Sequence, residues 1–156
     1  MRVELEIQRA TTSDNTPGDE QFRRWINAVP TTGEQTFQLT IRIVDEPEAR
    51  QFNREYRGRD YATNVLSFPA ELPEGIPEEV RQSQLGDILI CAQVVENEAL
   101  ERQRPEKDHW AHLTIHGILH LLGYDHEESA NATVMESLET EILGNLGISD
   151  PYLNIA

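Results

Sequence analysis

The sequence predicts a single α+β domain over residues 1–156, with a small sheet of about four strands packed against about five helices. Two segments alternate apolar and polar residues as half-buried strands do, and several longer segments carry apolar residues at helical spacing. No repeat, low-complexity tract or interdomain linker interrupts the sequence. A chain of this length can bury roughly 70% of the surface that it exposes when unfolded, so one core is sufficient without a disulfide or structural metal.

The first half of the chain is expected to alternate strands with helices. Residues 3–7 and 37–43 have apolar side chains at every second position, which is the period of a strand with one buried face. Between these strands, Asp19 can cap a helix whose apolar residues follow the helical period and which ends at Pro30. A strand, a helix and a second strand are therefore predicted in that order.

The second predicted helix carries a basic cluster. Asp45 with Glu48 three residues later resembles a capping box, which predicts a helix from this point to about Tyr56. Four of the 13 basic residues of the chain lie within ten positions in and after this helix, at Arg50, Arg54, Arg57 and Arg59. We expect them to form a basic strip within an otherwise acidic surface.

The second half is expected to supply two more strands and then three helices. Residues 65–68 and 87–91 are short β-rich runs, and the acidic, proline-rich stretch 70–84 between them predicts a mobile loop. Helical patterns then occupy residues 93–103, 107–122 and 127–146. The second of these three segments is apolar, and its length suits a buried central helix.

Charge and cysteine content exclude several classes of protein. Lys and Arg number 13 against 28 Asp and Glu, a net charge of −15, whereas a protein that coats DNA through its backbone normally has a basic face. With Cys91 alone no intramolecular disulfide can form, and the N-terminal residues do not resemble a secretory signal. The apolar runs fall far short of the ~20 residues that span a bilayer. These features predict a cytoplasmic protein with no membrane or DNA partner.

Three histidines near the end of the central helix form the strongest chemical signal. His116 and His120 lie one turn apart on the same face, at the separation from which two imidazoles can reach a single metal ion. Gly123 can adopt the left-handed conformation that ends a helix, so the chain can turn back and bring His126 towards the same ion. Three nitrogen ligands leave one tetrahedral position open, as in catalytic zinc sites. The pattern predicts one Zn²⁺ per chain, although such ligands accept other divalent ions.

The remaining histidines have other interpretations. His112 to His120 spans eight residues, ~12 Å of helix axis, which is too far for His112 to meet the other ligands at one ion. His112 is instead expected to pack beside the site or to support a ligand, and His109 is assigned no role. The alternative for all of these histidines is that they are polar residues satisfied within the core.

The spacing His-x-x-x-His-x-x-Gly-x-x-His is also that of the metzincin proteases. In those enzymes a glutamate follows the first histidine and acts as the general base, whereas Gly117 occupies this position here. Glu127 or Glu128 would need an unforeseen geometry to take its place. A protease is therefore disfavoured.

The segment 116–126 resembles the signature of the YbeY-type family of bacterial metal-dependent endoribonucleases. Its histidine spacing, its glycine and its Gly-Tyr-Asp-His ending all coincide with the family pattern. Further blocks are similar to that family across nearly the whole chain. These blocks are Tyr56–Asp60 with Thr63–Pro69, Leu85–Ile88, Trp110–His112 and Asp150–Leu153.

The resemblance implies a single zinc held by His116, His120 and His126, and cleavage of single-stranded RNA in a cleft. It also implies that the chain acts on the 3′ end of the 16S rRNA precursor and in ribosome quality control, with the small ribosomal subunit and its proteins as partners. Arg57 matches the functional arginine of the family, and a guanidinium can offset the charge that develops during phosphoryl transfer. The alternative for Arg57 is a surface residue on a charged loop, and the role of Arg59 stays open.

Two smaller signals allow more than one interpretation. Asp125 precedes a predicted ligand and can orient a ligand ring through its second nitrogen, or it can cap the following helix. Ser67 lies in a predicted strand close to a proline. We expect it to be structural, because no histidine stands beside it to activate a nucleophile.

Two other classes of function fit the same residues. In the first, the chain is a non-catalytic ribosome assembly factor, whose metal is structural and whose acidic surface docks to basic ribosomal proteins. In the second, it is a zinc hydrolase of small molecules or peptides, which would use the same open zinc position and need no basic surface. An endoribonuclease is the function that the sequence favours.

Overall fold

A computed structural model describes residues 1–125 and 128–153 of the chain. The elements are β1 (Arg2–Ala10), α1 (Asp19–Asn27), β2 (Thr36–Val44), α2 (Glu46–Arg57), β3 (Val65–Pro69), α3 (Glu78–Ser83), β4 (Gln84–Cys91), α4 (Ala92–Glu101), α5 (Glu106–Leu121) and α6 (Ser129–Asn145). The α+β class and the four strands are confirmed, and these residues form six helices rather than about five. Within the same residues, no helix is both long and apolar enough to cross a membrane.

The short helix α3 corrects the prediction of a loop over residues 70–84. Pro77 stands at its N-cap, and Glu78 and Glu79 occupy its first turn, where the partial positive charge of a helix N-terminus favours acidic side chains. Arg81 lies in its last turn and donates to the carbonyl of Pro73 at 3.1 Å. A favourable placement of charges therefore supports a helical turn in a stretch whose composition is typical of a loop.

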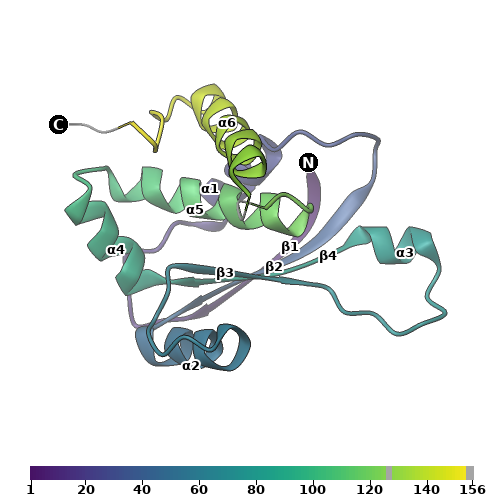
Figure 1. Cartoon of the computed structure of the whole chain (residues 1–156), viewed down its shortest axis with the longest axis horizontal. Coiled ribbons are helices and arrows are strands. Elements are labelled where there is room, and N and C mark those ends of the chain that lie inside the picture. The colour runs from purple at the N-terminus through teal and green to yellow at the C-terminus, as the bar shows by residue number, and fades with distance from the viewer. Residues whose placement is uncertain (126–127, 154–156) are drawn as a thin grey trace.

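The four strands form one mixed sheet in the order β1-β2-β4-β3. β1 and β2 are parallel, with Leu5 opposite Leu39 and Ile7 opposite Ile41, and β2 is also parallel to β4. β3 is antiparallel to β4 and forms one edge of the sheet. In Figure 1, α5 and α6 lie above this sheet and α2 lies below it, so helices cover both faces.

The strands divide their side chains between two hydrophobic cores, one on each face of the sheet. Successive residues of a strand point to opposite faces. On β4, Ile88 and Ile90 contribute to the larger core, which also contains residues of α1, α5 and α6. Leu89 and Cys91 contribute to the smaller core under α2. The central helix α5 therefore packs on one face of the sheet and the arginine-bearing helix α2 on the other.

The central helix α5 is buried as predicted, and it lies very close to the sheet at Gly117. Ten of its 16 residues are buried. A Cβ atom at Gly117 would be 3.1 Å from Cδ1 of Ile88 and 3.3 Å from Oγ of Ser67. The hydroxyl of Ser67 donates to the carbonyl of Gly117 at 2.9 Å, in agreement with the structural role expected of this serine. The missing side chain at Gly117 thus sets the distance between helix and sheet.

The predicted capping box at the start of α2 is wrong. Asp45 occupies the N-cap, but its side chain makes no capping hydrogen bond. Its carboxylate instead accepts a hydrogen bond from the hydroxyl of Thr11 at 2.6 Å and another from the side-chain amide of Gln93 at 2.7 Å. Glu48 pairs with Arg42 at 2.6 Å. The hydrogen bonds from Thr11 and Gln93 lower the pKa of Asp45 to about 2. They also connect three segments of the chain that are distant in sequence.

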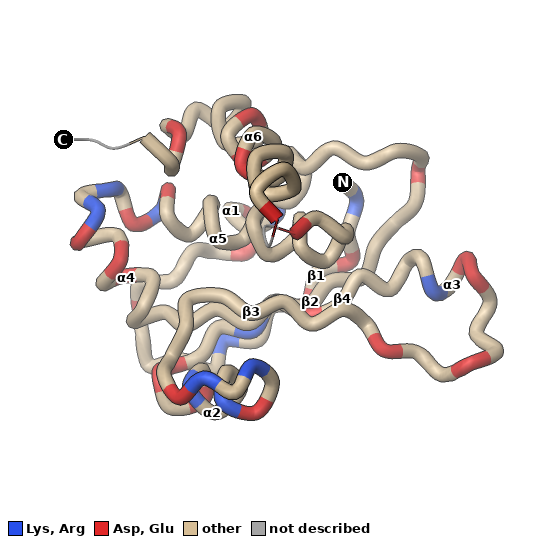
Figure 2. The backbone as a smooth tube through the Cα atoms, in the orientation of Figure 1, with Lys and Arg blue, Asp and Glu red and all other residues tan. Residues whose placement is uncertain are grey.

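Acidic and basic residues are mixed along the chain, and the basic strip expected near Arg57 is present in part (Figure 2). Arg50, Arg54 and Arg57 are exposed, and their spacing of four and three residues places them on one face of α2. Arg50, however, is paired with Asp60 through hydrogen bonds of 2.7 and 3.0 Å. This pair reduces the net positive charge of the strip.

Replacing Gly117 by alanine is expected to destabilise the fold, although alanine favours a helix over glycine by up to ~1 kcal/mol. The added methyl group meets Ile88 and Ser67, and such overpacking typically costs ~1–3 kcal/mol. Gly144→Ala in α6 is the matched control, because nothing lies within 4 Å of its Cβ position and the variant should gain stability. Urea unfolding followed by circular dichroism measures both. Equal stabilisation of the two variants would contradict the close packing of α5.

The hydrogen bonds of Asp45 predict a pH-dependent contribution to stability. Because folding lowers the pKa of Asp45, its contribution is complete above the ordinary value of 3.8 and is lost as the pH falls towards 2. We expect Asp45→Asn to lower the free energy of unfolding at neutral pH, and its difference from the parent protein to shrink as the pH falls through this range. Urea unfolding at a series of pH values measures the effect. Asp14→Asn, at an exposed position, is the control and should show no such trend.

Candidate metal centre

Two histidines on the last turns of α5 bring one ring nitrogen each to the same point. The Nε2 atoms of His116 and His120 are 3.1 Å apart, and the ring planes meet at 79°. Two nitrogens that each lie about 2.0–2.1 Å from one tetrahedral ion would be roughly 3.3 Å apart. The i, i+4 spacing of these histidines therefore produces a pair of nitrogens that could share a metal ion.

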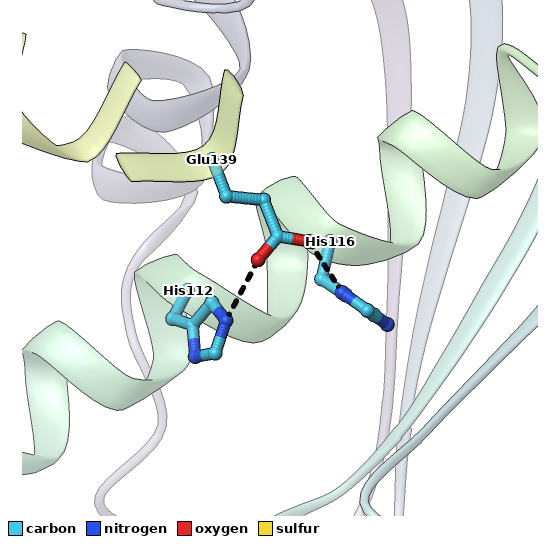
Figure 3. Close-up of side chains that lie close together, drawn as sticks. All are labelled: His112, His116 and Glu139. Atoms are coloured by element: carbon cyan, nitrogen blue, oxygen red, sulfur yellow. Dashed lines mark hydrogen bonds and ion pairs between the residues drawn. The ribbon is translucent and has the colours of Figure 1, made fainter. Parts of the chain in front are cut away.

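A buried carboxylate from α6 holds the other side of the His116 ring (Figure 3). Glu139 is fully buried, and its Oε1 lies 2.5 Å from Nδ1 of His116. Its Oε2 lies 3.0 Å from Nε2 of His112 and accepts a hydrogen bond from the hydroxyl of Tyr152. When Nδ1 of a histidine donates to a carboxylate, the ring orientation is fixed and Nε2 is the nitrogen left to face a metal.

The pKa shifts at this site make Glu139 an anion and leave His112 and Tyr152 neutral. Burial would raise the pKa of Glu139, but hydrogen bonds from His112 and His116 outweigh it and lower this pKa to about 2. Burial lowers the pKa of His112 despite the neighbouring carboxylate, so His112 is a neutral donor at neutral pH. Burial, reinforced by Glu139, raises the pKa of Tyr152, so its hydroxyl keeps the proton that it donates. Glu139 is therefore a buried anion that is held by hydrogen-bond donors.

Two sets of donors in this cluster could hold a metal ion. His112, His116 and Glu139 place one ligand atom each within 4.8 Å of one another, which supports the metal site expected on this helix. In that set, however, the carboxylate oxygens already accept hydrogen bonds from both histidines and from Tyr152. The second set uses the Nε2 atoms of His116 and His120 and leaves all of these hydrogen bonds in place. In the second arrangement Glu139 would support His116 instead of binding the ion.

The segment after α5 was expected to bring the third ligand to the site. His126, the predicted third ligand, lies outside the described residues. Gly123 has a φ of +102° just after the end of α5, as the predicted left-handed turn requires. Asp125 does not cap the following helix, because the N-cap of α6 is Glu128. The capping alternative for Asp125 is therefore wrong, and its orienting role stays a prediction.

The other two histidines of α5 are buried, and each meets a carboxylate. The contact of His112 with Glu139 agrees with the supporting role expected of His112. His109, which was assigned no role, is fully buried, and its Nε2 lies 2.9 Å from Glu98. Glu98 also accepts from the side chain of Asn64 at 3.0 Å. His109 is therefore a polar core residue with a partner of its own.

The structure places Arg57 across the sheet from the histidines. Arg57 is the last residue of α2, and side chains of the edge strand β3 contact both helices. On the α2 side, the ring centroids of Phe68 and Tyr56 are 5.0 Å apart. On the α5 side, the hydroxyl of Ser67 donates a hydrogen bond to the carbonyl of Gly117. The sheet therefore lies between α2, which carries Arg57, and the histidines of α5. The catalytic role of Arg57 stays a prediction.

The side chain of Arg59 lies 3.3 Å from the hydroxyl of Tyr61.

Sequence reasoning did not identify Glu139 or Tyr152. One signal could have found Glu139, because it shares a face of α6 with Met135, Ile142 and Leu143 at spacings that define the buried side of a helix. A carboxylate on a buried face requires a partner. The block Asp150–Leu153, which resembles the family, contains Tyr152, but it does not predict the contact with Glu139, which spans 13 residues and depends on how the chain turns after α6.

Comparison with known proteins places this arrangement in a family. The family model described as Endoribonuclease YbeY matches residues 5–147. The chain belongs to the endoribonuclease YbeY family. A relative of that name from Alkalilimnicola ehrlichii is 52% identical over 153 residues, which cover 96% of this chain and 91% of the relative. Another, from Stenotrophomonas maltophilia, is 51% identical over 152 residues, which cover 97% of this chain and 94% of the relative.

A solved structure is also similar to this member of the YbeY family. The solution structure of TM1509 from Thermotoga maritima matches with a TM-score of 0.54 at 25% sequence identity. The match covers 95% of this chain and 99% of the other. Membership of the family confirms the resemblance read from the histidine motif, and the similarity extends over nearly the whole chain.

Replacing Glu139 by alanine is expected to lower the free energy of unfolding by ~2–4 kcal/mol, because His112 and His116 lose their buried acceptor. Glu141→Ala, at an exposed position on the same helix, is the matched control and should change stability by less than ~0.5 kcal/mol. Urea unfolding of the metal-free proteins measures both changes. A loss for Glu139→Ala no larger than that of the control would mean that the carboxylate does not hold these helices together.

Proposed function

We propose that this chain is a zinc-dependent endoribonuclease that cleaves single-stranded RNA in the 3′-end maturation of 16S rRNA and in ribosome quality control. Membership of the endoribonuclease YbeY family supports cleavage of RNA and a place in rRNA processing. Residues 1–156 act as one catalytic domain in the cytoplasm, and the small ribosomal subunit with its proteins is the partner.

The observation that carries this proposal is the pair of Nε2 atoms that face each other at 3.1 Å on His116 and His120. Their separation is close to that of two ligands on one tetrahedral ion. Glu139 supports His116 through Nδ1, a contact typical of zinc-bound histidines. The proposed third ligand is His126, which follows the left-handed turn at Gly123 in the sequence.

Each residue of the proposed site has a separate role in the reaction. His116, His120 and His126 would hold the zinc ion, which would supply Lewis-acid chemistry towards a phosphate oxygen or a water molecule. Glu139 and His112 keep His116 in a single orientation. Arg57 donates to the phosphate oxygens and offsets the negative charge that increases as phosphorus becomes five-coordinate.

Two adjoining cavities beside the end of α5 offer a path for an RNA strand. One, of about 410 Å³, has Tyr124 in its wall, and the other, of about 360 Å³, has Arg81. Phe37 and Leu122 line both. None of the described residues that line either cavity is acidic, although the chain contains 28 Asp and Glu. A groove without acidic residues, with aromatic rings on which bases can stack, suits a single strand bound by an acidic protein.

The close packing at Gly117 disfavours a peptide hydrolase of the metzincin type. Such an enzyme carries its general base at this position. A Cβ atom at Gly117 would already lie 3.1 Å from the side chain of Ile88 and 3.3 Å from that of Ser67, so a glutamate there would force these side chains to move. An RNA hydrolase does not need a carboxylate at this position.

Single-turnover cleavage of a single-stranded RNA by the zinc-loaded protein tests the proposal. We expect His120→Ala to lose both cleavage and the zinc that the parent retains after desalting, as measured by elemental analysis. Arg57→Ala should keep the zinc while its rate falls by roughly 100-fold, the typical effect of removing one donor to a transition-state charge. Arg23→Ala, an exposed arginine of α1, is the matched control and should cleave at the parent rate.

Each result of this experiment has a separate meaning. Equal rates for the parent and His120→Ala would overturn the metal-dependent mechanism. Equal rates for Arg57→Ala and Arg23→Ala would remove Arg57 from it. A protein that retains zinc and associates with the small ribosomal subunit, but cleaves no RNA, would instead be a non-catalytic assembly factor.

A further inference from the structure

The segment that follows α6 turns back onto the metal centre and is anchored at several points. Arg104 donates to the carbonyl of Ser149 at 3.2 Å. The carboxylate of Asp150 accepts from the backbone amide of Tyr152 at 2.8 Å. These contacts hold the side chain of Tyr152 where its hydroxyl donates to the buried Glu139. A residue near the C-terminal end of the chain is thereby connected to His116.

We propose that Tyr152 is a positioning residue for the metal site, because its hydroxyl fixes the carboxylate of Glu139, which in turn fixes His116. The turn over residues 149–152 then sets the affinity and the geometry of the metal site without supplying a ligand. This inference rests on the proposed function in one respect, namely that His116 is a metal ligand.

The two oxygens of Glu139 have different neighbours. Oε2 is shared by Nε2 of His112 and the hydroxyl of Tyr152, whereas Oε1 meets Nδ1 of His116. A carboxylate can rotate about the bond to its terminal carbon, and such a rotation would move both oxygens together. With two donors on Oε2 this rotation is opposed, so Oε1 stays in line with His116.

Tyr152 and His112 also hold each other in place. Nε2 of His112 lies 3.3 Å from the hydroxyl of Tyr152, and the two rings meet edge to face with centroids 5.5 Å apart. The hydroxyl, Nε2 of His112 and Oε2 of Glu139 thus form a closed triangle. Loss of the hydroxyl would break two of its three sides and keep the packing of the rings. Tyr152→Phe therefore tests the hydroxyl separately from the ring.

The test is the zinc affinity of Tyr152→Phe, measured in competition with a chelating indicator. We expect the affinity to fall about 10-fold, since removing a group that supports a metal ligand typically costs 10–100-fold. The visible absorption bands of the Co²⁺-substituted variant should shift, because the ligand geometry changes. Tyr56→Phe removes a hydroxyl from an exposed tyrosine of α2 and should keep both the parent affinity and the parent spectrum.

A second comparison separates positioning from a general loss of structure. If Tyr152 acts through Glu139, adding Tyr152→Phe to Glu139→Gln should cause little further loss of zinc affinity. Additive losses would overturn this route of action. The metal-free Tyr152→Phe variant should stay folded and lose less stability than Glu139→Ala, because Glu139 keeps His112 and His116 as partners and the ring of Tyr152 remains.

The outcomes separate this inference from the proposed function. If the parent protein binds no zinc, the proposed metal site fails and the inference fails with it. If the parent binds zinc, but Tyr152→Phe has the parent affinity and the parent Co²⁺ spectrum, the role of Tyr152 is overturned and the metal site stands.

Discussion

The burial of one carboxylate, that of Glu139, governs the arrangement of the metal centre. Removing an ionised group from water costs several kcal/mol unless hydrogen bonds replace its hydration. Glu139 is fully buried, and its partners come from α5 and from the segment after α6. The helices α5 and α6 can therefore pack favourably only in the register that places this carboxylate between His112 and His116. The orientation of the proposed ligand His116 follows from that requirement.

The sheet constrains the same helix from the other side. Gly117 follows His116 directly, so one residue meets the carboxylate of α6 while the next meets β3 and β4. The hydrogen bond from Ser67 to the carbonyl of Gly117 holds α5 at this short distance. A helix fixed on two sides presents His116 and His120 with little freedom. Sites on such rigid elements are held more accurately than sites on loops.

An acidic protein that acts on RNA has to separate its own charge from that of the substrate. The cavities beside the end of α5 have no acidic residue among the described residues that line them, although the net charge of the chain is −15. The exposed arginines Arg54 and Arg57 lie on α2, beyond the edge strand β3, and Arg50 is paired with Asp60. Along the proposed path, repulsion between protein and RNA is therefore kept low mainly because these cavity walls carry no carboxylate among the described residues.

The sequence by itself determined those features that depend on a local period. The alternation of the first two strands, the apolar central helix and the i, i+4 pair of His116 and His120 can be read from neighbouring residues, and the structure agrees with each. Only the tertiary structure decided the partners of Asp45, Glu139 and Tyr152, which lie 13 to 48 positions away. A buried carboxylate selects its donors after the helices have docked, and no repeat along the chain encodes which side chains that docking brings together.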